Sequence, residues 1–150
     1  MINQESAAAS ISLALSADHE RLDRLFDDAC TRVGAGDFPG ATMSFSEFAR
    51  GLLHHIAVEE RSLFPAFDAR ARMPGPTAVM CHEHRAIERS LALAADALTS
   101  LGASRFATEA AELSAILAAH NMKEERIIYP RSDAALDETE RAAVLEALRR

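Results

Sequence analysis

The chain contains no tryptophan, a single tyrosine, and only two cysteines, six glycines and five prolines in 150 residues. So few turn-forming residues, together with alanine at about a fifth of the chain, exclude a strand-rich sandwich and favour helices. Seven phenylalanines and many aliphatic side chains must therefore fill the core. A hydrophobic fraction of 49% is too high for a disordered chain, and the length predicts a single domain over residues 1–150.

A basic cluster and a long apolar run are also absent. The net charge of −7 argues against sequence-independent binding of nucleic acid, which needs a positively charged face. No apolar stretch reaches the roughly 18 residues that a membrane span requires, and the N-terminus has neither the basic opening nor the cleavage pattern of an export signal. We therefore expect a cytoplasmic protein without membrane partners, in which Cys30 and Cys81 are free thiols.

Turn-forming residues divide the chain into segments long enough for four helices. They cluster in GAGDFPG, MPGPT, SLGAS and YPRSD, at residues 34–40, 73–77, 100–104 and 129–133. Between these breaks apolar residues recur every three or four positions, which predicts one buried stripe on each helix. A shorter segment at 137–149 begins at Asp137 and has Glu140 three residues later, the pattern of a capping box that starts a fifth helix.

Polar residues interrupt the four stripes at positions where an ordinary bundle carries leucine. The interrupting residues are His19, His55, Glu59, His84, His120 and Glu124. The second and fourth stripes each carry a histidine followed by a glutamate four residues later. Side chains with this spacing lie about 6 Å apart along the helix axis and about 40° apart around it, so both reach a common point.

An internal repeat relates the two halves of the chain. The segment 52–65, LLHHIAVEERSLFP, matches the segment 117–130, LAAHNMKEERIIYP, at an offset of 65 residues. The same offset maps His19 onto His84 without a gap. Two helical hairpins thus carry one pattern, and a bundle formed from them would direct four imidazoles and two carboxylates at one another. Bundle proteins assemble dinuclear metal sites in this way.

The cost of burial also favours metal. Buried imidazoles and carboxylates without partners each cost several kcal/mol, and no lysine or arginine shares their stripes. Two cations would satisfy them, whereas the alternative is a bundle in which they only hydrogen-bond one another. Mixed nitrogen and oxygen ligation suits iron, manganese or zinc. Iron is the first expectation, because carboxylates that bridge two ions leave coordination positions for oxygen chemistry.

Four separate segments resemble the hemerythrin-like family, also called the HHE cation-binding domain. These segments are DHERLDRLF (18–26), HHIAVEERSLFP (54–65), EHRAI (83–87) and HNMKEERIIYP (120–130). The resemblance covers about residues 10–131 and implies an all-α, up-down antiparallel four-helix bundle, to which the segment 137–149 adds a short C-terminal fifth helix. It also implies a non-heme di-iron centre with an oxo or hydroxo bridge.

The resemblance assigns roles to the six interrupting residues. It makes the histidines terminal nitrogen ligands and the glutamates bridging carboxylates, that is His19, His55, His84 and His120 with Glu59 and Glu124. The chain departs from the oxygen-carrying hemerythrins because Met80 and Glu88 stand where a second histidine flanks His84 in those proteins. In addition, Glu124 follows His120 by four residues, where those proteins have an aspartate five residues on. Both differences favour iron-oxidising or peroxide-consuming chemistry over reversible oxygen carriage.

Further polar residues flank the predicted ligands. Glu88 and Asp23, each four residues after a predicted ligand histidine, are alternative oxygen ligands; otherwise they face solvent or surround the ligands. His82 is an alternative nitrogen ligand and otherwise a surface residue. The repeated Glu60 and Glu125, together with Arg61 and Arg126, are expected to form a solvated rim or to orient the side chains that surround the ligands.

Tyr129 and Phe64 stand at equivalent positions of the repeat. We expect both in the core, with a redox role for Tyr129 as an alternative.

The predicted function is a non-heme di-iron protein that binds or reacts with O2, peroxide or NO. One alternative is an iron storage, redox or gas-sensor module without turnover, which would use the apolar face of the segment 137–149 as a contact surface. The other is a peroxide-consuming or ferroxidase-type enzyme. The expected cofactor is a pair of iron ions, with zinc or manganese as alternatives, and a homodimer is left open.

Overall fold

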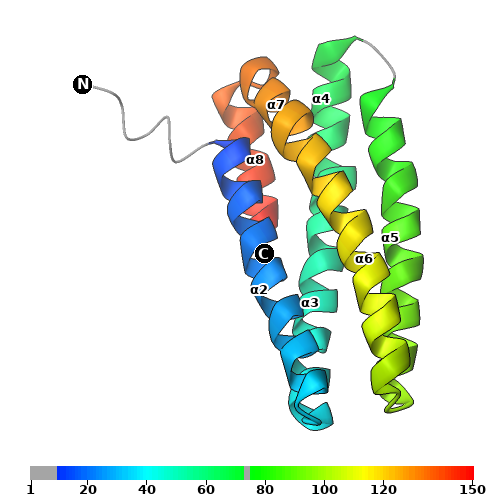
Figure 1. The fold of residues 1–150 in the computed structure, drawn as a ribbon. Coiled ribbons are helices and arrows are strands. Elements are labelled where there is room, and N and C mark those ends of the chain that lie inside the picture. The colour runs from blue at the N-terminus through cyan, green and yellow to red at the C-terminus, as the bar shows by residue number, and fades with distance from the viewer. Residues whose placement is uncertain (1–9, 73–74) are drawn as a thin grey trace.

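The computed structural model describes residues 10–72 and 75–150, and all regular structure within these ranges is helical (Figure 1). The elements in chain order are α2 (Ile11–Gly34), α3 (Phe38–Val58), η1 (Glu59–Leu63), α4 (Phe64–Ala71), α5 (Pro76–Thr99), α6 (Ala103–Lys123), η2 (Glu124–Ile128), α7 (Tyr129–Ala135) and α8 (Glu138–Arg149). They form four long runs, α2, α3–η1–α4, α5 and α6–η2–α7, which alternate in direction, with α8 beside the first two (Figure 1). The prediction of an all-α bundle with a short C-terminal helix is confirmed.

The predicted breaks at 34–40 and 100–104 are turns between helices. Gly36 has a φ of 79°, a conformation that glycine adopts without strain, and Asp37 then caps α3 by accepting a hydrogen bond from the Gly40 amide at 3.0 Å. The break predicted at 73–77 begins in residues 73–74, which lie outside the described residues, as do residues 1–9 of the N-terminus. The capping box predicted at Asp137 and Glu140 is present and starts α8.

The break predicted at 129–133 is wrong, because the helix continues to Ala135. Proline lacks an N–H, and in an α-helix its ring clashes with the carbonyl four residues earlier. The five residues before Tyr129 instead form the π-helix η2, in which the Tyr129 amide donates to the carbonyl of Glu124, five residues back. This wider turn brings Pro130 into a continuous run. Pro65 follows the π-helix η1 in the same way.

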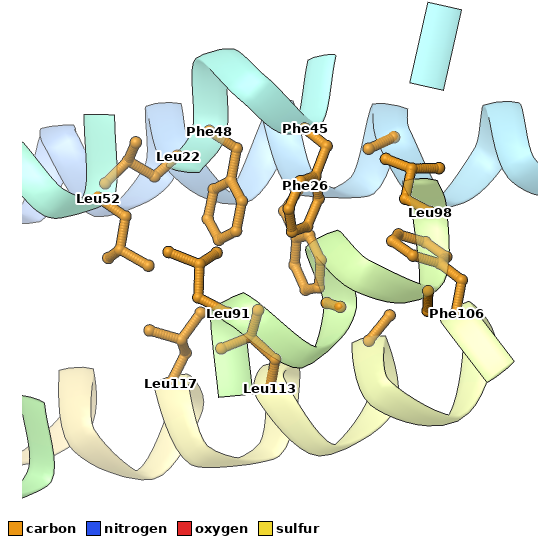
Figure 2. Packing of buried hydrophobic residues seen from close by; sticks show 14 of the residues in the cluster. Leu22, Phe26, Phe45, Phe48, Leu52, Leu91, Leu98, Phe106, Leu113 and Leu117 are labelled. Carbon is orange, nitrogen blue, oxygen red and sulfur yellow. The ribbon is translucent and has the colours of Figure 1, made fainter. Parts of the chain in front are cut away.

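Two apolar clusters fill the bundle, one on each side of the polar residues. The first includes Phe26, Phe45, Phe48 and Phe106, whose rings meet between the helices (Figure 2). Phe26 and Phe48 are stacked with ring centroids 4.7 Å apart. The second contains side chains from both ends of the chain, namely Ile11, Leu15, Val58, Leu63, Phe64, Met80, Ile128, Tyr129, Leu136, Val144 and Leu145. Along α2, His19 lies between Leu15 of the second cluster and Leu22 of the first, so the polar residues form a layer between two apolar regions.

The C-terminal helix α8 packs on the bundle. Val144 and Leu145 are 1% and 4% exposed and belong to the second cluster, and α8 contacts α2, α3 and η1. The apolar face of the segment 137–149 is therefore covered by the chain itself, which removes the contact surface expected for the sensor alternative.

Two further expectations concern the thiols and the membrane. Cys30 and Cys81 are free, as expected. Among the described helices, none combines the length and the hydropathy that a bilayer span requires.

Candidate metal centre

The six residues predicted from the sequence meet in one buried layer. They form two groups in which one nitrogen or oxygen atom of each residue lies within 4.8 Å of those of the others. The two groups are His19, His55, Glu59 and Glu124, and Glu59, His84, His120 and Glu124. Both glutamates belong to both groups and are fully buried. Two adjoining sets of donors that share two carboxylates are the arrangement expected of a dinuclear site.

Each glutamate lies close to one histidine on its own helical run and to one histidine from the other helical hairpin. The His55 and Glu59 side chains lie one turn apart, with Nε2 3.2 Å from Oε1, and His120 Nε2 lies 2.9 Å from Glu124 Oε1. Across the bundle, His84 Nε2 lies 3.2 Å from Glu59 Oε2, and His19 Nε2 lies 3.2 Å from Glu124 Oε2. All four imidazoles thus turn Nε2 towards the carboxylates.

The opposite ring nitrogen of each of these four histidines donates a hydrogen bond to a second carboxylate. All four Nδ1–oxygen distances are 2.8 Å, in the pairs His19–Glu125, His55–Asp18, His84–Glu60 and His120–Glu83. Such bonds fix the orientation and tautomer of an imidazole and raise its basicity as a ligand. Glu60 and Glu125 therefore contact His84 and His19 directly, which the sequence did not predict.

Sequence reasoning missed Asp18 and Glu83. The signal was present, because each directly precedes a predicted ligand histidine and the two positions are related by the same offset of 65 residues. Each serves the histidine of the neighbouring helix in its hairpin, not the histidine beside it in sequence. Arg21 pairs with Asp18, and Lys123 pairs with Glu83, so these outer carboxylates are themselves held in place.

Six carboxylates around four imidazoles make the layer strongly attractive to positive charge. Burial lowers the pKa of His55, but the charge of Glu59 and the hydrogen bond to Asp18 outweigh it and raise this pKa to about 10. Burial also lowers the pKa of His84, but its contacts with Glu124 and Glu59 outweigh this effect and raise the pKa to about 10. For Glu124, burial raises the pKa, but contacts with histidines hold it well below the usual value. His55 and His84 therefore keep their protons well above neutral pH.

Hydrogen bonds within the chain do not satisfy the whole layer. Among the described residues, Glu59 Oε2, His84 Nε2 and Glu124 Oε1 are buried side-chain atoms without a hydrogen-bond partner. An unsatisfied buried polar group costs about 1–3 kcal/mol, and more when it is charged. Two carboxylate oxygens and an imidazole nitrogen can all coordinate one cation, so the donor set fits a metal ion.

Two cavities adjoin the layer. One of about 10 Å³ is lined by the six residues together with Leu52, Ile56, Ile87, Leu117 and Asn121. A larger cavity of about 420 Å³ lies against α2 and α6, and Leu117 and Asn121 line it as well. The wall between the layer and the larger cavity is therefore one turn of α6.

The alternative ligands lie outside both groups. Asp23 lines the larger cavity, and Glu88 pairs with Arg85 at 2.8 Å. His82 is exposed.

Tyr129 and Phe64 are both buried, as expected, but only Tyr129 offers a polar atom to the layer. The Tyr129 hydroxyl donates to Glu59 Oε1 at 2.6 Å, whereas the Phe64 ring stacks on the His84 ring with centroids 5.8 Å apart.

Comparison with known proteins agrees with the geometry. Residues 11–132 match the model of the hemerythrin HHE cation binding domain, which includes all six residues of the layer. Searches of curated proteins and of solved structures find no match. Because the matched region covers most of the chain and its cation-binding function agrees with the buried histidine and glutamate cluster, the chain belongs to the hemerythrin HHE cation-binding family.

Proposed function

We propose that the protein binds two iron ions in this layer, with the four histidines as terminal ligands and Glu59 and Glu124 as bridging carboxylates. One observation carries the proposal: two groups of donors share both glutamates, and the described buried atoms of these groups that lack a hydrogen bond, on Glu59, His84 and Glu124, lie close to one another. Manganese or zinc would accept the same donors, so the identity of the metal is a point for measurement.

Bound iron would supply one-electron chemistry and coordination positions for O2, peroxide or NO. The chain would hold the imidazoles in orientation through the four outer carboxylates and exclude bulk water with the two apolar clusters. The small cavity of about 10 Å³ has room for about one water molecule, which restricts reactants to molecules of similar size. We infer that they enter from the larger cavity past Leu117 and Asn121, which line both spaces.

Metal content per chain tests this proposal. Elemental mass spectrometry of untagged protein, produced with iron available, should find about two iron atoms per chain. The His55→Ala/Glu59→Ala double variant should retain less than one. The matched control is His82→Ala/Glu88→Ala, which changes the same two residue types outside the layer and should keep both ions. One zinc per chain, no metal in a folded protein, or equal metal in both double variants would contradict the di-iron assignment.

A peroxide-consuming or iron-oxidising activity is the candidate reaction that the site favours. Six ligands leave two octahedral ions short of donors, and the apolar face of α8, which a sensor module was expected to use, is packed against the bundle. Loaded protein should therefore consume a large molar excess of peroxide or Fe(II). A single stoichiometric change in the absorption spectrum without further consumption would instead favour a sensor or storage role.

A further inference from the structure

The two donor groups have different aromatic neighbours, Tyr129 beside the His19–His55 group and Phe64 beside the His84–His120 group. The offset of 65 residues relates every member of one group to a member of the other, but it also relates Tyr129 to Phe64. The Tyr129 hydroxyl lies 2.6 Å from Glu59 Oε1 and 2.9 Å from Glu124 Oε2. It also lies 3.2 Å from Nε2 of both His19 and His55. One hydroxyl oxygen thus lies within hydrogen-bond distance of one atom from every member of the His19–His55 group.

The His84–His120 group has no such hydroxyl. The Phe64 ring stacks on His84 and offers no polar atom. Among the described residues, three buried atoms without a hydrogen bond face this second group, namely Glu59 Oε2, His84 Nε2 and Glu124 Oε1. Glu59 Oε2 lies 3.2 Å from His84 Nε2, and Glu124 Oε1 lies 2.9 Å from His120 Nε2. The phenol therefore hydrogen-bonds to one half of the layer, whereas in the other half these three atoms make only ion-pair contacts with one another and with His120.

The π-helix η2 explains how Tyr129 reaches the layer. Tyr129 follows Glu124 by five residues. In a π-helix the amide of residue i+5 bonds to the carbonyl of residue i, so Tyr129 completes the turn that begins at Glu124. In an α-helix the fifth residue would point about 140° away around the axis. Because η1 has the same geometry, Phe64 is brought to its own half of the layer in the same way, and only the hydroxyl distinguishes the two positions.

We propose that the Tyr129 hydroxyl stands in for a cation in the His19–His55 position, so that the protein binds its two ions in a fixed order. The first ion enters the His84–His120 position, where no phenol contact is displaced and Glu59 Oε2, His84 Nε2 and Glu124 Oε1 gain a partner. The second ion enters the His19–His55 position more weakly, because the phenol must give up its contacts with both glutamates. The inference rests on the dinuclear site proposed above.

The test is a titration of the metal-depleted full-length chain with Co²⁺ alone, followed by calorimetry and visible absorption. Two binding events are expected, the second weaker by about tenfold or more, as the loss of hydrogen bonds to charged groups implies. Two variants related by the repeat assign the events. His84→Ala should lose the tight event, and His19→Ala should lose the weak one.

A second matched pair isolates the hydroxyl. Tyr129→Phe removes one oxygen and should strengthen the weak event by about tenfold while leaving the tight event unchanged. Phe64→Tyr adds a phenol to the other half and should weaken the tight event. These two variants keep the aromatic ring and its packing, so they test the proposed order of binding even if either alanine variant fails to fold.

Several results would overturn the inference. These are two equal binding events in the unchanged chain, loss of the tight event in His19→Ala, or an unchanged or weaker second event in Tyr129→Phe. In each case two ions would still bind, and the proposed dinuclear site would stand. Fewer than two Co²⁺ per unchanged chain would overturn both the order of binding and the dinuclear site.

Discussion

The carboxylate of Asp18 accepts a hydrogen bond at 2.8 Å from Nδ1 of His55, on the side of the ring opposite Glu59. The bond joins α2 to α3, because Asp18 directly precedes His19 on one helix and contacts His55 on the next. Glu83 repeats this bond with His120 between α5 and α6. Each hairpin is therefore tied together at the level of the metal layer, and the outer carboxylates couple the helix packing to the positions of the donors.

Removing this carboxylate should weaken metal binding without removing a ligand. We expect Asp18→Ala to lower the affinity for metal by about 10- to 100-fold, because His55 loses the bond that fixes its ring. Competition with a chelator measures the change. Glu88→Ala is the control, since that carboxylate pairs with Arg85 outside the layer, and its affinity should match that of the unchanged chain. Equal affinities in the two variants would show that Asp18 does not orient the ligand.

The aromatic cluster should determine much of the stability. Phe48 is 1% exposed and stacks on Phe26, so Phe48→Ala should lower the free energy of unfolding by about 3–5 kcal/mol. Urea denaturation of metal-depleted protein measures this change without a contribution from bound ions. Leu53 on the same helix is 45% exposed, and Leu53→Ala should change the free energy by no more than about 0.5 kcal/mol. A similar loss in both variants would contradict the packing described for this cluster.

Much of the site could be predicted because its ligands interrupt regular stripes. Periodicity identifies a residue such as His19 as core-facing, and the repeat strengthens this prediction because the same interruption occurs at His84. The outer carboxylates escape this reasoning. Asp18 is adjacent to His19 and so points about 100° away from the stripe, where periodicity predicts solvent. Its partner lies on another helix, and only the register between α2 and α3 brings them together.

The π-helices explain the other failures of prediction. A proline signals a helix end only when the preceding turn is α-helical, and the wider turns before Pro65 and Pro130 remove the clash on which that rule depends. The same turns decide where the residue before each proline points. The burial of Tyr129 could be predicted from its place in the repeat, but the contact of its hydroxyl with Glu59 depends on the π-helical turn.

The stability of the metal-depleted chain should fall as the pH rises from neutral to about 10. The pKa values of His55 and His84 are 6.5 in their ordinary state and about 10 in the folded chain. Below pH 6.5 both the folded and the unfolded states hold these protons, and the stabilisation is fully present. Above it the folded state keeps protons that the unfolded state releases, so the stabilisation is lost as the pH approaches 10.

Urea midpoints at a series of pH values between 6 and 10 test this expectation. Loaded protein is the control, because a metal ion on the imidazole nitrogens replaces the protons and should flatten the dependence. A midpoint of the metal-depleted chain that stays constant or rises with pH would contradict the assigned protonation of the layer.

The C-terminal helix should behave as part of the core. Leu145 is 4% exposed and packs in the cluster that contains Leu15 and Val58, so Leu145→Ala should lower the free energy of unfolding by about 2–4 kcal/mol. Leu93→Ala, at a site 45% exposed, is the control and should leave the stability nearly unchanged. If α8 were instead a contact surface for another protein, Leu145→Ala would change association and leave the unfolding of the isolated chain unaffected. Because α8 also contacts η1, which begins at Glu59, the loss of packing should reach the metal layer and weaken metal binding as well.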